Sequence, residues 1–316
     1  MAKFGYQVLG FGSFTPAGGP GTWANAGDTI HTALGAVTVL GNGSAGVIAG
    51  GHSDNDTCED WNGSAFSSTD SLTTGRRSAR GGGTQSSALI IGGQVGNPTT
   101  ASVEYYNGSE WASANSLNTA GGSSTAATAV EDNSNAWSCS GFNRNATGSG
   151  TNYNGALPKH EIMRSGSWTT QGTDPLTERY YIAGGSCGSS GNGASVTGAN
   201  PSGLSTKNEE YTFSSGSSGT WTTNTDITTS VGNESSGCFG KTSADDLVVF
   251  CGRTASGTMA LTQEYSVGTW TAGANYPVTV RGNSGGGQTG NGLSVGGYDG
   301  SSYTNAAYIF TRAVST

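Results

Sequence analysis

Short apolar segments that end in a pair of small residues recur along the chain. The sequence reads Val-Ile-Ala-Gly-Gly at 47–51 and Leu-Ile-Ile-Gly-Gly at 89–93, and four later segments follow this pattern with substitutions. Apolar runs of this length, bounded by glycine, are typical of buried β-strands. The segments lie 42 to 58 residues apart, a period that indicates a β-propeller or a solenoid. We take as equivalent Gly50, Gly92, Ser140, Gly198, Cys251 and Gly296.

A second strand with acidic and aromatic residues follows each apolar segment, and a third strand that opens on an aromatic residue follows that one. In the second repeat these are Glu104-Tyr105-Tyr106 and Trp111, separated by an Asn-Gly pair typical of hairpin turns. Four antiparallel strands are therefore expected in this repeat, at 77–84, 87–93, 102–107 and 110–116. The acidic position is occupied in turn by Glu59, Glu104, Glu161, Glu209, Glu264 and Ala307.

The last repeat lacks its aromatic strand, and the N-terminal region carries an unmatched one. Gly21-Thr22-Trp23 has the same sequence as residues 219–221 and 268–270. We expect residues 22–30 to pair with the strand near 306–311 and so complete the last unit. The fold class predicted is all-β: a six-bladed β-propeller over residues 19–316, made of four-stranded antiparallel blades and closed by an N-terminal strand. A linear solenoid would need capped ends instead.

Glycine makes up 55 of the 316 residues, against roughly 7% in an average protein. The excess excludes an ordinary helical protein, and the innermost strands of a propeller give it a reason, because backbones approach closely near the axis. With 13 basic and 21 acidic residues the net charge is −8, and 7 Trp, 12 Tyr and 9 Phe can build cores. Sparse, scattered Lys and Arg argue against nucleic acid as a partner, and no apolar run predicts membrane insertion.

The di-glycine strand, the Glu-Tyr-Tyr segment and the Trp one hairpin later resemble kelch repeats over residues 19–312. Residues 104–111 and 116–120 are most similar to blades of the Gly/Ser/Thr-rich kelch-like proteins of marine bacteriophages. This resemblance implies a non-enzymatic virion structural protein: a tail fibre, an appendage or a surface decoration protein with a role in adhesion to a host surface or glycan. A carbohydrate-active or copper-radical-oxidase-like enzyme on a kelch propeller, or an intracellular kelch interaction module, are the alternatives.

The opening residues 4–12 resemble the N-termini of phage fibre and appendage proteins. Residues 1–18 are therefore expected to anchor the chain to another virion protein or to a second copy of itself, with the protein assembled in the host cytoplasm. The apolar side chains that would make this contact are Phe4, Tyr6, Leu9 and Phe11.

Two groups of residues are candidates for ligand binding. A long insertion in the third repeat combines rings with amides, a composition typical of adaptable recognition loops, although tolerated loop length is the alternative. Four arginines could line the channel and bind an anion, or could donate to backbone carbonyls near the axis. The first group is Phe142, Asn143, Arg144, Asn145, Tyr153 and Asn154, and the second is Arg76, Arg80, Arg179 and Arg281.

No catalytic arrangement stands out, and no cofactor or metal is predicted. The histidines, His31, His52 and His160, fall at different phases of the repeat, which argues against a shared metal site. Calcium at Asp54, Asp56 and Glu59 is conceivable, with a solvated loop as the alternative. Cys238 and Cys251 either face each other as a disulfide or are small buried thiols.

Overall fold

The computed structural model describes residues 20–122, 126–129, 135–142, 159–172, 175–187, 192–200, 202–215, 218–232, 237–240, 246–266 and 268–312. These residues form β-strands and loops, and they include no helix. In the part of the chain that the structure describes, there is thus no helical segment long and apolar enough to cross a membrane.

Of the 28 described strands, 24 form six four-stranded antiparallel sheets, which we number I to VI. Two small two-stranded sheets lie in loops: β16 (Ala199–Asn200) with β17 (Gly203–Leu204), and β22 (Arg253–Thr254) with β23 (Gly257–Thr258). Sheet I contains β2 (Thr38–Gly41), β3 (Gly46–Ala49), β4 (Cys58–Trp61) and β5 (Phe66–Ser68). Sheet II contains β6 (Arg80–Thr84), β7 (Ser87–Ile91), β8 (Val103–Tyr106) and β9 (Trp111–Ala114). Sheet III contains β10 (Ala126–Ala129), β11 (Asn135–Cys139), β12 (His160–Arg164) and β13 (Ser167–Thr170). The expected strands of the second repeat are therefore present, each shorter at its ends.

The second half of the chain repeats this order. Sheet IV contains β14 (Ala183–Cys187), β15 (Asn192–Val196), β18 (Asn208–Ser215) and β19 (Ser218–Thr223). Sheet V contains β20 (Gly237–Gly240), β21 (Asp246–Phe250), β24 (Thr262–Ser266) and β25 (Thr269–Ala272). Sheet VI contains β26 (Ser284–Gln288), β27 (Asn291–Val295), β28 (Ala307–Thr311) and β1 (Thr22–Asn25).

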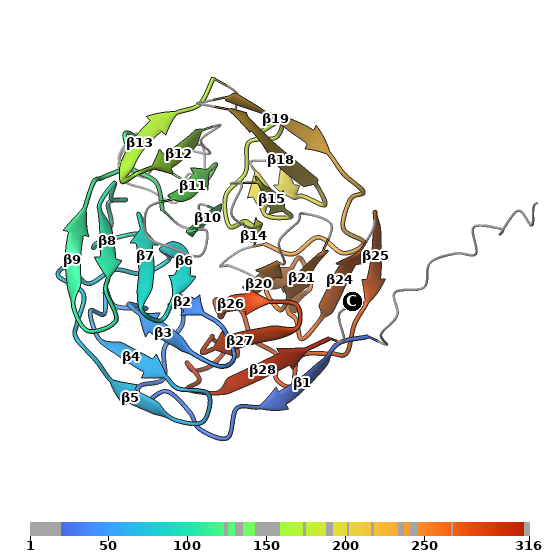
Figure 1. Cartoon of the computed structure of the whole chain (residues 1–316). Helices are drawn as coiled ribbons and strands as arrows, with labels where there is room; N and C mark the ends of the chain where they lie inside the picture. Colours follow the sequence, from blue (N-terminus) through green and yellow to red (C-terminus); the bar gives the residue numbers. More distant parts are fainter. Residues whose placement is uncertain are drawn as a thin grey trace, which may run out of the picture.

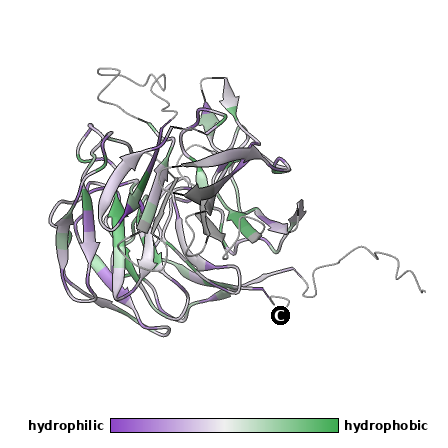
Figure 2. Ribbon diagram, turned by 45° about the horizontal axis from the view of Figure 1, so that its top comes forward, coloured by the Kyte–Doolittle hydropathy of each residue, from purple (hydrophilic) through white to green (hydrophobic). Residues whose placement is uncertain are grey.

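The sheets stand around a central axis, with the first strand of each sheet innermost (Figure 1). The inner strands β2, β6, β10, β14, β20 and β26 contact one another in this order, and β26 also contacts β2. Each neighbouring pair of sheets, VI and I included, shares a cluster of buried apolar side chains. The core is thus divided into wedges between sheets, and Figure 2 shows its hydrophobic residues within the strands.

The N-terminal strand β1 belongs to the sheet built from the end of the chain. Thr22 pairs with Thr311, and Asn25 pairs with Tyr308, in antiparallel register. The Trp23 ring packs on Phe250, Tyr276 and Phe310 at centroid distances of 4.8, 4.7 and 4.9 Å. Its Nε1 donates a hydrogen bond of 3.0 Å to Thr262 Oγ1 in sheet V.

The buried carboxylate of Glu264 in sheet V binds both described ends of the chain. Its Oε1 accepts from the Gly21 backbone N–H at 2.9 Å, and its Oε2 accepts from Arg312 at 2.9 Å. The Glu264 side chain is 3% exposed and that of Arg312 is 10% exposed. The two ends of the described chain are therefore held at one point beside sheet V.

The pair of small residues after each second strand has a backbone requirement. In the second sheet Gly92 and Gly93 have φ of 61° and 101°, in the left-handed region that favours glycine. Three repeats place other residues at the first position of the pair: Ser140, Thr197 and Cys251 have φ of 54°, 54° and 60°. The equivalent residue in the fourth repeat is thus Thr197, and the expected Gly198 is the second member of its pair.

Gly92→Ala is expected to lower the free energy of unfolding by at least about 2 kcal/mol. A Cβ at this position would lie 2.3 Å from the backbone oxygen of Gly121, so the neighbouring segment would have to move. Gly172→Ala is the matched control, because a Cβ there meets nothing within 4 Å. Urea unfolding of both variants measures the difference, and equal midpoints would contradict this account of the glycine pair.

The acidic position of the third strand is shifted by one residue in two repeats relative to the sequence analysis. Glu104 lies opposite Ile90, and the equivalent pairings are Gln263 with Val249 and Tyr308 with Ser294. Glu264 and Ala307 were therefore assigned wrongly. Because successive side chains of a strand point to opposite faces, this shift moves Glu264 to the other face of sheet V.

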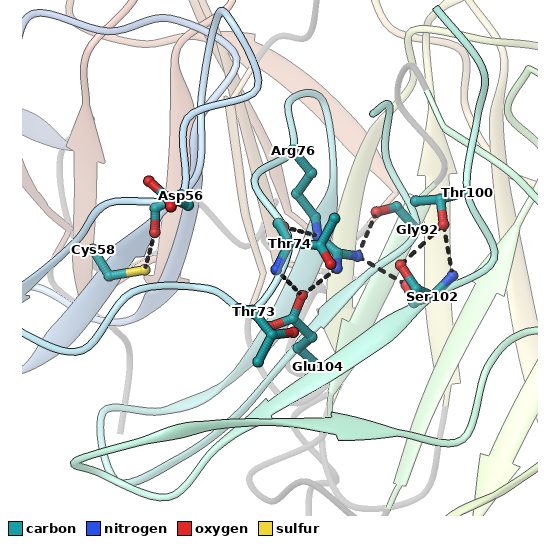
Figure 3. Close-up of polar contacts among 9 residues, drawn as sticks. All are labelled: Asp56, Cys58, Thr73, Thr74, Arg76, Gly92, Thr100, Ser102 and Glu104. Atoms are coloured by element: carbon teal, nitrogen blue, oxygen red, sulfur yellow. Dashed lines mark hydrogen bonds and ion pairs between the residues drawn. The ribbon is translucent and has the colours of Figure 1, made fainter. Parts of the chain in front are cut away.

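The residue at the acidic position fixes the segment that crosses into its own sheet. The Glu104 carboxylate accepts from the backbone N–H of Thr73 and Thr74 at 2.7 and 3.2 Å and pairs with Arg76 (Figure 3). Related contacts join Glu59 to His31, Glu161 to Asn118 and Thr119, Glu209 to Arg179, and Gln263 to Thr228 and Thr229. The recurring acidic residue thus stabilises the fold by holding the crossing segment in place.

Candidate binding face

The connections of the sheets place two kinds of loop at the same end of the molecule. Because consecutive strands are antiparallel, the loop from the second to the third strand lies beside the segment that crosses to the next sheet. We call this end the crossover face, and the other end, with the tight hairpins, the hairpin face. Described second-to-third-strand loops on the crossover face include residues 50–57, 92–102, 251–261 and 296–306.

Several of these described loops are themselves small hairpins, joined by backbone bridges. Tyr298 and Tyr303 form an antiparallel bridge, as do Gln94 and Thr99. Between the two tyrosines, Asp299 accepts from the backbone N–H of Ser301 and Ser302 at 2.7 and 2.8 Å. These backbone hydrogen bonds, first of all the one from Ser302, lower the pKa of Asp299 to about 2. The Asp299 carboxylate that holds this turn is therefore ionised over the whole physiological pH range.

Four side chains from sheets VI and I form a continuous series of contacts on this face. The Arg281 guanidinium lies 4.9 Å from the centroid of the Tyr298 ring. The Tyr298 ring lies 5.2 Å from Tyr303, and Tyr303 lies 4.6 Å from His52. His52 is exposed and the other three are partly exposed. We call Arg281, Tyr298, Tyr303 and His52 the aromatic-basic strip.

The backbone under the aromatic-basic strip is firmly held. Arg281 and Tyr298 exchange two backbone hydrogen bonds, with N···O distances of 3.0 and 2.7 Å. Tyr303 packs so closely on Gly35 that a Cβ there would lie 2.9 Å from its ring. The backbone and neighbouring side chains of the fold thus hold the strip in place.

A second arginine occupies the place of Arg281 in sheet II. Arg77 forms a bridge with Gln94, as Arg281 does with Tyr298. Its guanidinium pairs with Asp54 and donates to Gln94 Oε1 at 3.1 Å. Arg281 is therefore the equivalent of Arg77 and not of Arg179, the residue with which the sequence analysis grouped it. Arg77 contacts Asp54 and Gln94, and Arg281 stacks on the Tyr298 ring.

Two of the four arginines predicted to line the channel are buried between strands. Arg76 and Arg179 are 1% and 0% exposed, so they cannot contact a ligand in a solvent-filled channel. Arg179 donates to the backbone oxygens of Thr197 and Lys207 at 2.7 and 2.8 Å, and to Glu209 at 2.8 Å. The alternative of donation to backbone carbonyls therefore holds for both. Burial lowers the pKa of Arg179, and the Glu209 carboxylate opposes this shift.

The other two predicted channel residues are partly exposed. Arg80 lies on the innermost strand β6, and its Nη1 donates to the Ala79 backbone oxygen at 3.3 Å. Arg281 lies on the crossover face, as described above. Neither position tests whether an anion binds near the axis, so that role stays a prediction.

The predicted recognition loop is described only at its first residue. Phe142 is 3% exposed and packs with Tyr180 and Ala199, so it is a core residue and its prediction as a ligand contact is wrong. Its backbone forms an antiparallel bridge with Gly122 of the neighbouring segment. Asn143, Arg144, Asn145, Tyr153 and Asn154 lie outside the described residues, as do Phe4, Tyr6, Leu9 and Phe11 of the predicted anchor.

The acidic residues proposed for calcium have different partners. Asp54 pairs with Arg77, and Glu59 accepts from the His31 backbone N–H at 2.9 Å and contacts its Nδ1 at 2.7 Å. Asp56 is exposed. Within the described ranges, no three His, Cys, Asp or Glu residues are placed to hold a metal ion. Glu59 and Asp54 thus stabilise loops of the protein itself.

Cys251 is a free, buried thiol, and the register places Cys238 opposite Val249. The proposed disulfide is therefore absent. Cys58, Cys139 and Cys251 are all buried and free. Burial raises the pKa of Cys58 to about 12 and raises those of the other two thiols as well.

These three thiols are expected to resist a thiol reagent at pH 8 in the folded protein, because the thiolate is the reactive form and it is strongly disfavoured. All five cysteines should react after unfolding in guanidinium. Peptide mapping after alkylation measures this, with the unfolded chain as control. Rapid native labelling of the Cys58, Cys139 or Cys251 peptides would contradict the burial described here.

The protein resembles solved structures in fold. The protein YjhT superposes with a TM-score of 0.70 over 91% of this chain and 99% of its own, at 13% sequence identity. The chain has a β-propeller-type fold. No protein-family model matches the sequence, and no curated protein matches it. A likeness at this identity shows the fold alone, so the kelch-repeat and bacteriophage resemblances stay predictions.

The aromatic-basic strip was missed as a unit by the sequence analysis. Its members are far apart in the chain, and only Arg281 was a candidate. A signal was nevertheless present, because Tyr298 and Tyr303 flank an Asp-Gly-Ser-Ser segment typical of a turn.

Proposed function

We propose that the chain is a six-bladed kelch-like propeller whose ring is closed by its N-terminal strand. The six four-stranded sheets, the contact of β26 with β2 and the pairing of β1 with β28 support this. So does the apolar cluster shared by sheets VI and I, because the two ends of an open arc would not bury a common core.

We propose that the protein is a non-enzymatic structural component of a bacteriophage virion that binds a host surface through its crossover face. One observation carries this proposal. Thr22 pairs with Thr311, so the chain enters the propeller at the hairpin face, while the aromatic-basic strip lies on the crossover face. A segment that precedes Gly21 can therefore attach at one end while the other end stays accessible.

The sequence adds support for the virion and for this polarity. Residues 104–111 and 116–120 resemble blades of phage kelch-like proteins, and residues 4–12 resemble the N-termini of phage fibres. The partners proposed are another virion protein, or a second copy of this chain, at the N-terminal segment and a host glycan or protein at the crossover face. Attachment to the virion through the N-terminal segment leaves the loops of the crossover face accessible. These loops can then present rings, amides and charges to the host glycan or protein.

The test uses purified particles of a bacteriophage whose genome encodes the chain. Mass spectrometry should find the chain in amounts comparable to other virion proteins, and the isolated protein should compete with particles for adsorption to host cells. Absence from the particle would overturn the virion assignment. Catalytic turnover of a host polysaccharide by the isolated protein would overturn the non-enzymatic assignment.

A further inference from the structure

We propose that Asn62 and Asn107 are sites of spontaneous modification, at which the asparagine cyclises onto the following glycine and reopens as aspartate or isoaspartate. The tripeptide Asn-Gly-Ser occurs three times in the chain, at 42–44, 62–64 and 107–109. All three copies lie in described hairpin turns, but the structure gives them two different environments. The proposal is carried by this difference and does not depend on what the protein binds.

The reaction needs only water as a co-reactant. The backbone nitrogen of the glycine attacks Cγ of the asparagine side chain and loses its proton to solvent, and the side-chain amide leaves as ammonia. Such an intramolecular attack is fast when the reacting groups are held close together. One water molecule then hydrolyses the five-membered imide. Cleavage of one of its C–N bonds gives aspartate, and cleavage of the other gives isoaspartate, whose main chain runs through the former side chain.

The N–H of the glycine determines whether this attack can begin. Gly63 and Gly108 are exposed, and neither backbone N–H donates to an acceptor in the part of the chain that the structure describes. Gly43 is buried, and its N–H donates to the backbone oxygen of Asn291 at 3.3 Å. Reaction at Asn42 must therefore first break this hydrogen bond and bring the nitrogen into contact with water, which adds to the barrier.

The side-chain carbonyl of the asparagine is prepared for attack in all three turns. Asn62 Oδ1 accepts from the backbone N–H groups two and three residues later, both at 3.0 Å, and Asn107 Oδ1 does the same, both at 2.9 Å. Negative charge develops on this oxygen as the new C–N bond forms, and N–H groups directed at it stabilise that charge. Asn42 Oδ1 has the corresponding contacts at 2.8 and 3.2 Å. The environment of the glycine nitrogen is thus what distinguishes the sites.

Asn42 is further restrained by a contact with sheet VI. Its Oδ1 also accepts from Asn291 Nδ2 at 3.2 Å, and the same Nδ2 donates to Ser44 Oγ at 2.8 Å. Asn42 is half-buried, whereas Asn62 and Asn107 are exposed. Water therefore reaches the two outer turns more easily than the turn that contains Asn42.

The modification would change the hairpin face, where both outer turns lie. Each conversion replaces a neutral amide with a carboxylate on a chain whose net charge is already −8. Isoaspartate also lengthens the main chain within a turn that is closed by a hydrogen bond of 3.3 Å from Asn62 N–H to the Ala65 oxygen. The outer hairpins of sheets I and II would thus become more negative and less regular, while the crossover face stays unchanged.

The experiment incubates the folded full chain at pH 8 in water enriched in heavy oxygen and then maps its peptides by mass spectrometry. The peptides that contain residues 62 and 107 should each incorporate one heavy oxygen, and an isoaspartyl methyltransferase should methylate a fraction of each. The Asn42 peptide should convert at least about tenfold more slowly, as expected when a hydrogen bond must be broken first. Incubation at pH 5 should slow the reaction, because the glycine nitrogen must lose its proton.

The chain unfolded in guanidinium is the matched control, because the identical tripeptides then have the same environment. Asn42, Asn62 and Asn107 should convert at similar rates in that state. Asn107→Gln tests the cyclisation, since the longer side chain would have to form a less favourable six-membered ring. This variant should form no isoaspartate at residue 107, while Asn62 reacts as in the wild type. Thermal melting verifies that the variant is folded.

Three results would overturn the proposal. Equal rates at Asn42 and at the two exposed sites in the folded chain would show that the glycine N–H does not control the reaction. Conversion without isoaspartate would indicate direct hydrolysis of the amide in place of cyclisation. Reaction in the unfolded chain but not at Asn62 and Asn107 of the folded chain would show that these turns protect their asparagines.

Discussion

Deletion of residues 1–25 is expected to abolish cooperative folding at 25 °C and to make the protein aggregate. Without β1, the edge of β28 is left unpaired, and exposed strand edges recruit other chains. The rings of Phe250, Tyr276 and Phe310 lose the partly buried Trp23 side chain, a loss that alone costs about 1.5–3 kcal/mol. Light scattering and thermal melting measure the outcome.

Deletion of residues 1–19 is the matched control, because it leaves Gly21 and the whole of β1 in place. This shorter deletion should melt as the full chain does. Trp23→Ala provides a graded version, with a lower melting temperature but a folded chain. If the deletion to residue 25 melts with the same midpoint and enthalpy as the full chain, β1 contributes nothing to the ring and the proposed closure is wrong.

The sequence could predict the repeat and its strands because the residues that carry them are local. A pair of small residues and an acid two positions before an aromatic, as in Glu104 and Tyr106, is visible in one short window. The register was less certain. In the fifth repeat Gln263 occupies the position that is acidic elsewhere, but the next residue, Glu264, is the one that matches the pattern by sequence. Only the observed pairing of Gln263 with Val249 shows which of the two residues is equivalent to Glu104.

The candidate site could not be predicted in the same way, because it depends on contacts between distant parts of the chain. His52 and Tyr303 lie at opposite ends of the sequence and meet because sheets VI and I are neighbours. Phe142 shows the converse difficulty. The polar composition of its loop suggested recognition, but the Phe142 side chain packs with Tyr180 and Ala199 in the core.

Arg179→Met is expected to lower the free energy of unfolding by about 3–5 kcal/mol, because it leaves a buried carboxylate without its cation. Arg179 and Glu209 are paired at 2.8 Å with side chains 0% and 1% exposed. The same guanidinium also satisfies the backbone oxygens of Thr197 and Lys207. Methionine fills a similar volume, so the loss reports the charge and the hydrogen bonds more than a cavity. Urea unfolding measures the change.

Comparison with an exposed ion pair near the same sheet distinguishes the effect of burial on stability from the effect of pairing. Lys207 and Asp226 are also 2.8 Å apart, but their side chains are 45% and 38% exposed. Lys207→Met should therefore cost no more than about 1 kcal/mol, because water replaces the lost partner. Adding Glu209→Gln to Arg179→Met should recover part of the loss, since it removes the stranded charge and leaves only the unsatisfied carbonyls. If Arg179→Met costs no more than Lys207→Met, the buried pair does not hold the crossing segment of sheet IV in place.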